Sequence, residues 1–372
     1  MNLKTLLPSW FVTLVYNFEI LKDRKKIEIK YRNVNEIIDT LIKENVGLNI
    51  QDPESARISL QNLLKNRPRE FEDGMNGYFG NQIIPIQQPV NDIGEISLIV
   101  GTYNDINKIG EFLNYYRNLG IEHFVVMDNC SDDGTLNFLM KQKDVDIYQI
   151  NTKYNSQKRA GWRNRLIAYY GLERYYLCLD SDEFLFFEDS ENSDIKSLIN
   201  IMKTKGQKHI RSFLLDMYAD KFFYNSTGED FINQCVYYDW STYSESKYGV
   251  GIHLRGGVRE RIFGISNENT KYPLFKATKG DFFTDHYPIF YQQKYSQSLD
   301  CGLKHYKFLP TDIKKYQEFV KSGIYSNGSS EYKRYLEVIE DGIPNFVSKY
   351  HSKKFDCASN VLNVLRSSIK RG

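Results

Sequence analysis

The chain has little net charge and no long apolar run. Its 49 Lys and Arg residues oppose 47 Asp and Glu residues, which leaves a formal charge of +2 over 372 residues. So small a charge gives no field for wrapping a polyanion, and we expect no nucleic-acid partner. Near the start, Asn17 and Glu19 interrupt an apolar stretch that lacks a small-residue cleavage site. The stretch therefore predicts neither a signal peptide nor a membrane-spanning helix.

Two interpretations of this N-terminal segment stay open. Pro8, Trp10 and Phe11 precede a basic stretch at residues 22–26, a combination that suits a helix lying in a membrane interface. The interpretation that we favour is an ordinary helix docked on the protein core.

Cysteine is scarce and scattered. The five cysteines are an odd number and include no Cys-x-x-Cys pair and no Cys/His cluster at zinc-ligand spacing. This pattern favours a protein of a reducing compartment over a disulfide-bonded protein. We expect a cytoplasmic protein, with peripheral attachment to the inner face of a membrane as the alternative.

Proline is absent between Pro89 and Pro273. Before this stretch the pattern has helical period, and Pro85 and Pro89 suit an extended linker because proline cannot continue a helix. Within it, helix-period segments alternate with short apolar runs at residues 96–100, 123–128, 145–150 and 175–180. Such alternation is typical of parallel strands joined by right-handed helical crossovers.

The pattern divides the chain into three predicted regions. Residues 1–92 form a helical N-terminal region, residues 93–310 an α/β domain, and residues 311–372 a helical C-terminal extension. The α/β domain should contain a mixed, mostly parallel sheet flanked by helices. Its ligand edge should lie at the carboxyl ends of the strands.

Polar residues follow three of the predicted strands. The first run leads into GTYND (101–105), the second ends at Asp128, and the last ends at Asp180 in the sequence DSDEF. The carboxylates of Asp180 and Asp182 can both reach one hard cation, Mg²⁺ or Mn²⁺, which keeps positions for diphosphate oxygens. For an isolated pair at this spacing, an exposed turn with a helix cap is the alternative.

These segments together resemble a known family. The series ISLIVGTYND, HFVVMDNCSDDGT and RAGWRNRLIAYYGLERYYLCLDSDEF, within residues 96–184, resembles the nucleotide-sugar-binding half of family 2 glycosyltransferases, which have the GT-A fold. The later blocks GGVRERIF, KYPLFKA, DHYP and LKHYKFL resemble a bacterial-type subgroup and are less specific. The resemblance implies a nucleotide-diphosphate sugar donor, a divalent metal and a glycan or glycolipid acceptor, as in polysaccharide biosynthesis.

The resemblance also implies binding residues. Asp128 would accept a hydrogen bond from the nucleotide base, Arg163 would face the diphosphate, and Arg259 would neutralise the leaving group. An Asx turn at Asp128 and solvated faces at the two arginines are the alternatives. The full implied set for the nucleotide sugar is Thr102, Tyr103, Asn104, Asp128, Arg163, Asn164, Asp180 and Arg259.

For the metal, the resemblance makes Asp182 the direct ligand and shares Asp180 between the metal and the ribose. A third ligand in such sites is often a distant histidine; we prefer His305, with His286 as the alternative. A buried structural histidine is the other interpretation of either. Glu183 differs from the residue that frequently follows this acidic pair in the family. We interpret it as an acid behind the metal ligands or as a local helix cap.

The predicted reaction needs two kinds of group. Cleavage of the bond between the anomeric carbon and phosphate builds charge on the diphosphate, which a metal and arginines stabilise. The acceptor hydroxyl needs a general base, for which Asp216, Glu260 and Asp285 are the candidates, and the sequence does not choose among them. The resemblance implies inversion at the anomeric carbon.

Two other functions are weighed against glycosyl transfer. A nucleotidyltransferase also sets acidic pairs on an α/β sheet, but no glycine-rich phosphate loop follows the first strand. A non-catalytic sugar- or nucleotide-binding protein with the same fold is the second alternative, because fold and motif do not certify chemistry.

Overall fold

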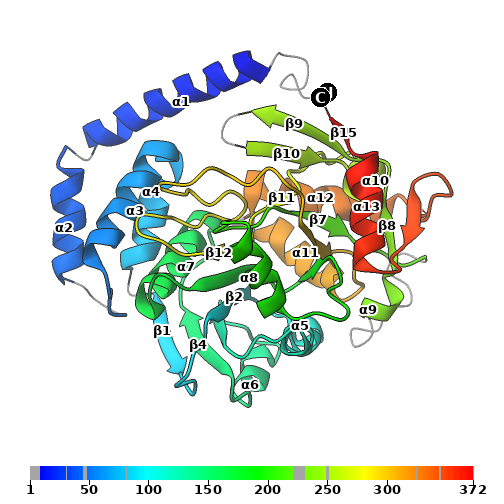
Figure 1. Ribbon diagram of the computed structural model, residues 1–372, viewed down its shortest axis with the longest axis horizontal. Coiled ribbons are helices and arrows are strands. Elements are labelled where there is room, and N and C mark those ends of the chain that lie inside the picture. Colours follow the sequence, from blue (N-terminus) through cyan, green and yellow to red (C-terminus); the bar gives the residue numbers. More distant parts are fainter. Residues whose placement is uncertain are drawn as a thin grey trace.

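A six-stranded sheet forms the centre of the computed structural model (Figure 1). The structure describes residues 9–30, 32–44, 48–80, 82–220, 231–248, 251–323, 325–342 and 345–371. The strand order is β1-β4-β3-β2-β5-β12, in which β2 to β5 are parallel and the two edge strands run antiparallel. The strands are β1 Ile83–Gln87, β2 Ile96–Thr102, β3 Phe124–Asp128, β4 Val145–Ile150, β5 Tyr175–Asp180 and β12 Leu274–Lys276.

Both faces of this sheet are covered. Along β2, Leu98 packs in one hydrophobic cluster with Phe112 of α5 (Ile106–Asn118). The next residue, Ile99, packs in a second cluster with Trp162 of α7 (Ser156–Tyr170). Successive strand residues point to opposite faces, so a continuous apolar run is what a sheet buried on both sides requires.

The N-terminal helices pack closely against α7. They are α1 Ser9–Lys30, α2 Val34–Glu44, α3 Pro53–Asn66 and α4 Pro68–Phe79. A side-chain carbon at Gly77 of α4 would lie 2.2 Å from the carbonyl oxygen of Lys158, and one at Gly161 would lie 2.3 Å from that of Gly74. Glycine is therefore required for these two helices to approach so closely.

A second, four-stranded sheet has the order β11-β7-β13-β6. Its strands are β6 Glu183–Phe187, β7 Ser212–Asp216, β11 Thr270–Lys271 and β13 Cys301–His305. β13 lies between β6 and β7, and its register sets His305 opposite both Glu183 and Asp216. This register brings His305 next to Asp216, which lies 89 positions earlier in the chain.

The remaining elements surround the two sheets. Two short sheets pair β8 Tyr237–Asp239 with β14 Ser352–Lys354, and β9 Ser244–Tyr248 with β10 Gly251–Arg255 and β15 Lys370–Arg371. The other helices are α6 Thr135–Leu139, α8 Ile195–Thr204, α9 Phe231–Gln234, α10 Val258–Phe263, α11 Asp312–Ser322, α12 Ser326–Glu340 and α13 Ala358–Ser368.

The predicted fold class is confirmed: the central sheet is mixed, mostly parallel and flanked by helices. The four apolar runs form β2 to β5. The stretch around Pro85, which was expected to be a linker, instead forms the edge strand β1, where a proline is tolerated. All five cysteines lie in the described part of the chain and are free.

The structure bears on only part of the N-terminal segment. Among the described helices, none is both long and apolar enough to cross a membrane. Pro8 and the side chains of Trp10 and Phe11 lie outside the described residues.

Candidate active site

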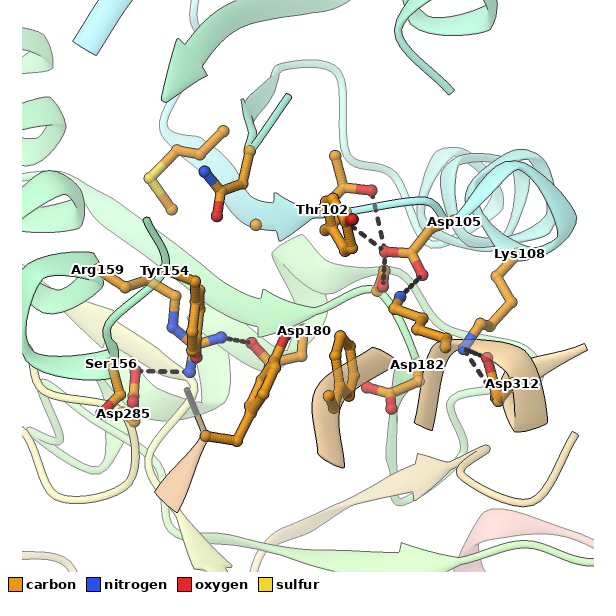
Figure 2. Close-up of a pocket in the computed structure, with 18 of the residues that line it drawn as sticks. Thr102, Asp105, Lys108, Tyr154, Ser156, Arg159, Asp180, Asp182, Asp285 and Asp312 are labelled. Carbon is orange, nitrogen blue, oxygen red and sulfur yellow. Dashed lines mark hydrogen bonds and ion pairs between the residues drawn. The ribbon is translucent and has the colours of Figure 1, made fainter. Parts of the chain in front are cut away.

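A polar cavity of about 420 Å³ opens at the carboxyl ends of β2 and β5 (Figure 2). The loop after β2, the turn after β5, α7, the segment before and after β13, and helices α11 and α12 all contribute to its wall. Its charged and polar lining includes Thr102, Tyr103, Asp105, Lys108, Asn129, Arg159, Asp180, Ser181, Asp182, Asp285, His286, His305, Lys307, Asp312 and Lys315.

Asp180, at the end of β5, is held by cations. Its Oδ1 lies 2.8 Å from a guanidinium nitrogen of Arg159 and 3.0 Å from one of Arg163, and Oδ2 lies 3.4 Å from Nζ of Lys271. Burial by itself would raise the pKa of Asp180, but the charges of Arg159 and Lys271 outweigh it and hold this pKa well below its ordinary value. The carboxylate therefore stays ionised.

Both arginines also bind a second carboxylate. Oδ1 of Asp285 lies 2.9 Å from Arg159 and 3.0 Å from Arg163. Arg159 lies four residues before Arg163 on α7, so the two guanidinium groups share one face of the helix. Figure 2 shows Arg159 lying between the carboxylates of Asp180 and Asp285.

Asp182 meets a different partner. Its Oδ2 lies 3.5 Å from Nε2 of His305, and the backbone N–H of Tyr306 donates to its carbonyl oxygen over 2.9 Å. Burial would raise the pKa of Asp182, but the facing His305 holds it well below its ordinary value. The pKa of His305 is itself raised, because the attraction of Asp182 exceeds the cost of burying the imidazolium.

His305 is oriented from behind by a buried chain of polar groups. Its Nδ1 lies 2.7 Å from Oδ1 of Asp216, and the other oxygen of Asp216 accepts from Nε of Arg259 over 2.8 Å. Arg259 in turn donates to Oδ1 of Asn269 over 2.7 Å. An Nδ1–H that donates to Asp216 leaves Nε2 directed at Asp182, an arrangement common for metal-binding histidines.

The donor set around His305 is suited to a divalent cation. One ligand atom each from Asp182, Glu183 and His305 lie within 4.8 Å of one another. Glu183 is already engaged, because it accepts from the backbone N–H of Asp180 over 3.0 Å and pairs with Lys271. Asp182 and His305 therefore remain as the groups that can take a metal, through one carboxylate and one imidazole.

His286 lies on the wall of the same cavity but has a different environment. Its Nδ1 donates to the carbonyl oxygen of Thr270 over 3.0 Å, and burial lowers its pKa to about 4. The ring is therefore neutral near pH 7, and no carboxylate of the described residues pairs with it.

The loop after β2 forms a second charged cluster. Asp105 accepts hydrogen bonds from Thr102 Oγ1 over 2.9 Å and from Ser181 Oγ over 2.7 Å, and it pairs with Lys315 of α11 over 2.7 Å. Close by, Lys108 pairs with Asp312 over 2.8 Å. Both ion pairs fasten α11 to the strand ends, so the C-terminal helices form part of the cavity wall.

Asp128 is buried at the end of β3, beside the cavity rather than on its wall. The backbone N–H of Ser131 donates to its Oδ2 over 3.1 Å, but Oδ1 has no hydrogen-bond partner among the described residues. Burial raises the pKa of this carboxyl group. A buried acceptor without a partner is uncommon and leaves a contact open for a ligand N–H.

The other predicted site residues divide into two groups. The predicted residues that line the cavity are Thr102, Tyr103, Asp180, Asp182, Asp285, His286 and His305. The structure does not bring Asn104, Arg163, Asn164, Asp216, Arg259 and Glu260 to its wall. Arg163, Asp216 and Arg259 are buried behind it, whereas Glu260 is exposed on α10.

Asn104 and Asn164 fasten neighbouring loops. The side chain of Asn104 donates to Asp132 over 2.9 Å and accepts from the backbone N–H of the same residue over 2.9 Å. The side chain of Asn164 donates to the carbonyl oxygen of Phe283 over 2.7 Å and accepts from its N–H over 2.9 Å. Asn164 thereby positions the segment that carries Asp285.

Several residues of the cavity were not predicted from the sequence. Arg159 carries a detectable signal, because it lies one helical turn before Arg163. Lys108, Asp312 and Lys315 carry none, since only the fold places α11 against α5. Two tyrosines add an aromatic wall: the rings of Tyr154, just before α7, and Tyr325, just before α12, stack with centroids 4.7 Å apart.

No protein-family model matches the chain, and no curated protein matches it. Solved structures resemble it weakly. Residues 1–349 of TarS from S. aureus are 13% identical, with 67% of this chain and 73% of that chain covered and a TM-score of 0.28. The mannosyltransferase PcManGT from Pyrobaculum calidifontis, in complex with GDP-Man and Mn²⁺, is 12% identical, with 84% of each chain covered and a TM-score of 0.28.

A third solved structure matches a shorter part of the chain. Glucosyl-3-phosphoglycerate synthase from Mycobacterium tuberculosis, in complex with Mn²⁺, UDP and phosphoglyceric acid, is 16% identical, with a TM-score of 0.25. The match covers 36% of this chain and 51% of that chain.

Proposed function

We propose that this protein is a metal-dependent GT-A glycosyltransferase that moves a sugar from a nucleotide-diphosphate sugar to a glycan or glycolipid acceptor. The observation that carries the proposal is the pair Asp180 and Asp182 at the end of β5, which lies in one polar cavity with Asp182 facing His305. The motif and its neighbours are those whose resemblance to family 2 glycosyltransferases is described above. A cavity at the carboxyl ends of parallel strands is a usual ligand site in α/β proteins.

Asp182 and His305 would hold the cation, Mn²⁺ or Mg²⁺. When bound, this cation supplies positive charge next to the leaving diphosphate. Asp216 keeps the Nε2 of His305 directed at Asp182, and the ionised state of Asp182 makes it ready to act as a ligand. A histidine that must lose its proton to bind metal makes the affinity fall at low pH.

The nucleotide would lie along the ends of β2 and β3. Thr102 and Tyr103 form the wall there, and the unpartnered Oδ1 of Asp128 would accept an N–H from the base. Arg159 and Lys315 line the same cavity, where they pair with Asp180 and Asp105, and both would contact the diphosphate when it binds.

We assign the general base to Asp285, because it lines the cavity, whereas Asp216 is buried behind it and Glu260 is exposed on α10. Arg159 holds the pKa of Asp285 below its ordinary value despite burial. Arg163 also pairs with Asp285 and keeps it ionised, so Asp285 would accept the proton of the acceptor hydroxyl once an anionic substrate draws Arg159 away. Inversion follows from the family resemblance, and the anomeric configuration of the product, read by NMR, tests it.

A thermal-shift screen tests the proposal most directly. Nucleoside diphosphates and nucleotide sugars are added to the wild type and to Asp182→Asn, with and without Mn²⁺. A ligand at about a hundred times its dissociation constant adds about 2.7 kcal/mol to the free energy of unfolding. We expect a metal-dependent shift for one nucleotide that the variant loses.

The outcomes separate the alternatives. No shift with any nucleotide contradicts the donor site and favours a protein that only kept the fold. A shift without hydrolysis of the corresponding nucleotide sugar in the presence of Mn²⁺ indicates a binding protein and contradicts catalysis.

A further inference from the structure

Helix α1 lies along the outside of the molecule, over α3 and α4 (Figure 1). One face of this helix is docked. Asp23 pairs with Arg69 of α4, Lys30 pairs with Glu72 over 2.7 Å, and Ile27 packs on the hydrophobic cluster of the N-terminal helices. Residues 23, 27 and 30 are spaced by four and three positions, so they share one face.

The opposite face is apolar and exposed. It carries Leu14, Phe18, Leu21 and Ile29, whose spacing also follows the helical repeat. The exposed fractions are 60% for Leu14, 67% for Phe18, 56% for Leu21 and 72% for Ile29. These four are among the most exposed large apolar side chains of the described residues, and together they form an apolar strip along one face of α1.

Lysines accompany the apolar strip. Lys25 lies within it, four residues from both Leu21 and Ile29, and Lys22 and Lys26 lie along its side. All three are exposed, and no acidic residue in the described part of the chain forms an ion pair with them. The two acidic residues nearest the strip are neutralised, since Glu28 pairs with Arg24 over 2.8 Å and Glu19 with Arg69 over 3.8 Å.

We propose that the outer face of α1 docks on an anionic lipid surface, with Leu14, Phe18, Leu21 and Ile29 inserted among the acyl chains and Lys22, Lys25 and Lys26 facing lipid phosphates. An exposed helix face that combines large apolar side chains with lysines is typical of helices that bind an anionic membrane interface. A protein partner would need a groove that is both apolar and acidic, whereas an anionic bilayer offers apolar acyl chains and acidic phosphates over its whole surface. The inference rests on α1 alone and stands independently of the proposed function.

Vesicle flotation of the full chain tests the proposal. Vesicles are made of phosphatidylcholine alone, or of phosphatidylcholine with phosphatidylglycerol. We expect the wild type to bind the second kind at least about tenfold more strongly, and added salt to weaken this binding, because lysine charges act only within a Debye length.

Two sets of variants separate the apolar and the basic components. Phe18→Ser with Leu21→Ser should lower the partition coefficient on anionic vesicles by at least about tenfold. Replacing Lys22, Lys25 and Lys26 by Gln should lower it by about fivefold for each lysine. Ile201→Ser, at a residue of α8 that is 46% exposed, is the matched control and should bind like the wild type.

Each contrary result overturns the proposal. Wild type that stays with the unbound fraction excludes a lipid surface, and so does a Phe18→Ser, Leu21→Ser variant that floats like the wild type. Sedimentation velocity without lipid tests a second copy as the occupant: a wild-type dimer that this variant converts to monomer assigns the strip to self-association instead. The replaced side chains are exposed, so thermal melts of all variants should match the wild type.

Discussion

Asp180 and Asp182 stand on either side of Ser181, yet the structure gives them opposite surroundings. Asp180 is bound by two guanidinium groups and an ammonium group, none of which can release its charge near neutral pH. Asp182 faces His305, which can release its proton. One carboxylate is thus held by permanent cations, while its neighbour faces a histidine that can give up its proton when a metal binds.

The two carboxylates belong to one motif, but their surroundings suit them to different tasks. A carboxylate with three cationic partners positions the groups around it, and removing it leaves buried charge behind. A carboxylate that faces a titrating histidine can bind a metal with little change in the stability of the fold, because the histidine can lose its proton. Four predictions follow from this contrast. The first three run from the largest expected effect to the smallest, and the fourth concerns the pH dependence of stability.

Asp182→Asn should lower turnover of the nucleotide sugar by at least about a thousandfold, because it removes a metal ligand beside the leaving group. The free energy of unfolding should change by no more than about 1 kcal/mol, since His305 can lose its proton when the facing charge disappears. Transfer assays with Mn²⁺ and urea unfolding measure the two quantities.

Glu260→Gln is the matched control for this variant, because Glu260 is exposed on α10, away from the cavity. It should keep wild-type turnover. An Asp182→Asn protein with near wild-type turnover contradicts the proposed metal site.

Asp180→Asn should have the larger effect on stability. Arg163 is fully buried and keeps its charge, so loss of its partner should cost about 2 kcal/mol. We expect less than the full cost of breaking a buried pair, because Asp285 still binds both arginines. Urea unfolding of the two asparagine variants side by side checks this, and equal stabilities would remove the distinction between the carboxylates.

The two histidines of the cavity should differ in metal binding. His305→Gln should weaken Mn²⁺ binding by at least about tenfold, because Nε2 of His305 is directed at Asp182. His286→Gln should leave the affinity within about twofold of the wild type, since His286 is anchored to Thr270 and pairs with no carboxylate of the described residues. Mn²⁺ titration followed by electron paramagnetic resonance measures both. The reverse order of effects would assign the metal to His286.

His209 has no acidic partner among the described residues, and it extends the contrast to the pH dependence of stability. His209 is buried against Phe290, and burial lowers its pKa from 6.5 to about 4. The unfolded chain therefore binds more protons than the folded protein between these values, so this contribution to stability is lost as the pH falls from about 6.5 to about 4. We expect a loss of about 3 kcal/mol.

A difference experiment isolates this effect from the other titrating groups. His209→Gln should be less stable than the wild type at pH 7, and the gap in free energy of unfolding should narrow toward pH 4. His286 and the carboxylates titrate in both proteins and cancel in the difference. A gap that does not change with pH contradicts the lowered pKa of His209.

The strand ends at the cavity could be predicted from local sequence. The apolar runs that end at Thr102, Asp128 and Asp180 form parallel neighbours, because a run buried on both faces is visible without knowledge of its partners. Arg159 was within reach of the same reasoning, as it shares a helical face with Arg163. Lys315 was not, because the contact between α11 and Asp105 joins residues 210 positions apart.

The sequence by itself determined the order of strands and helices and the acidic pair at the end of β5, because these follow from periodicity and from residues adjacent in the chain. Only the tertiary structure decided what each carboxylate meets. The register of β13 between β6 and β7 brings Asp216 to His305, and the packing of α7 brings Arg159 to Asp180. Charge and burial at a site depend on such distant partners, and spacing along one chain does not contain them.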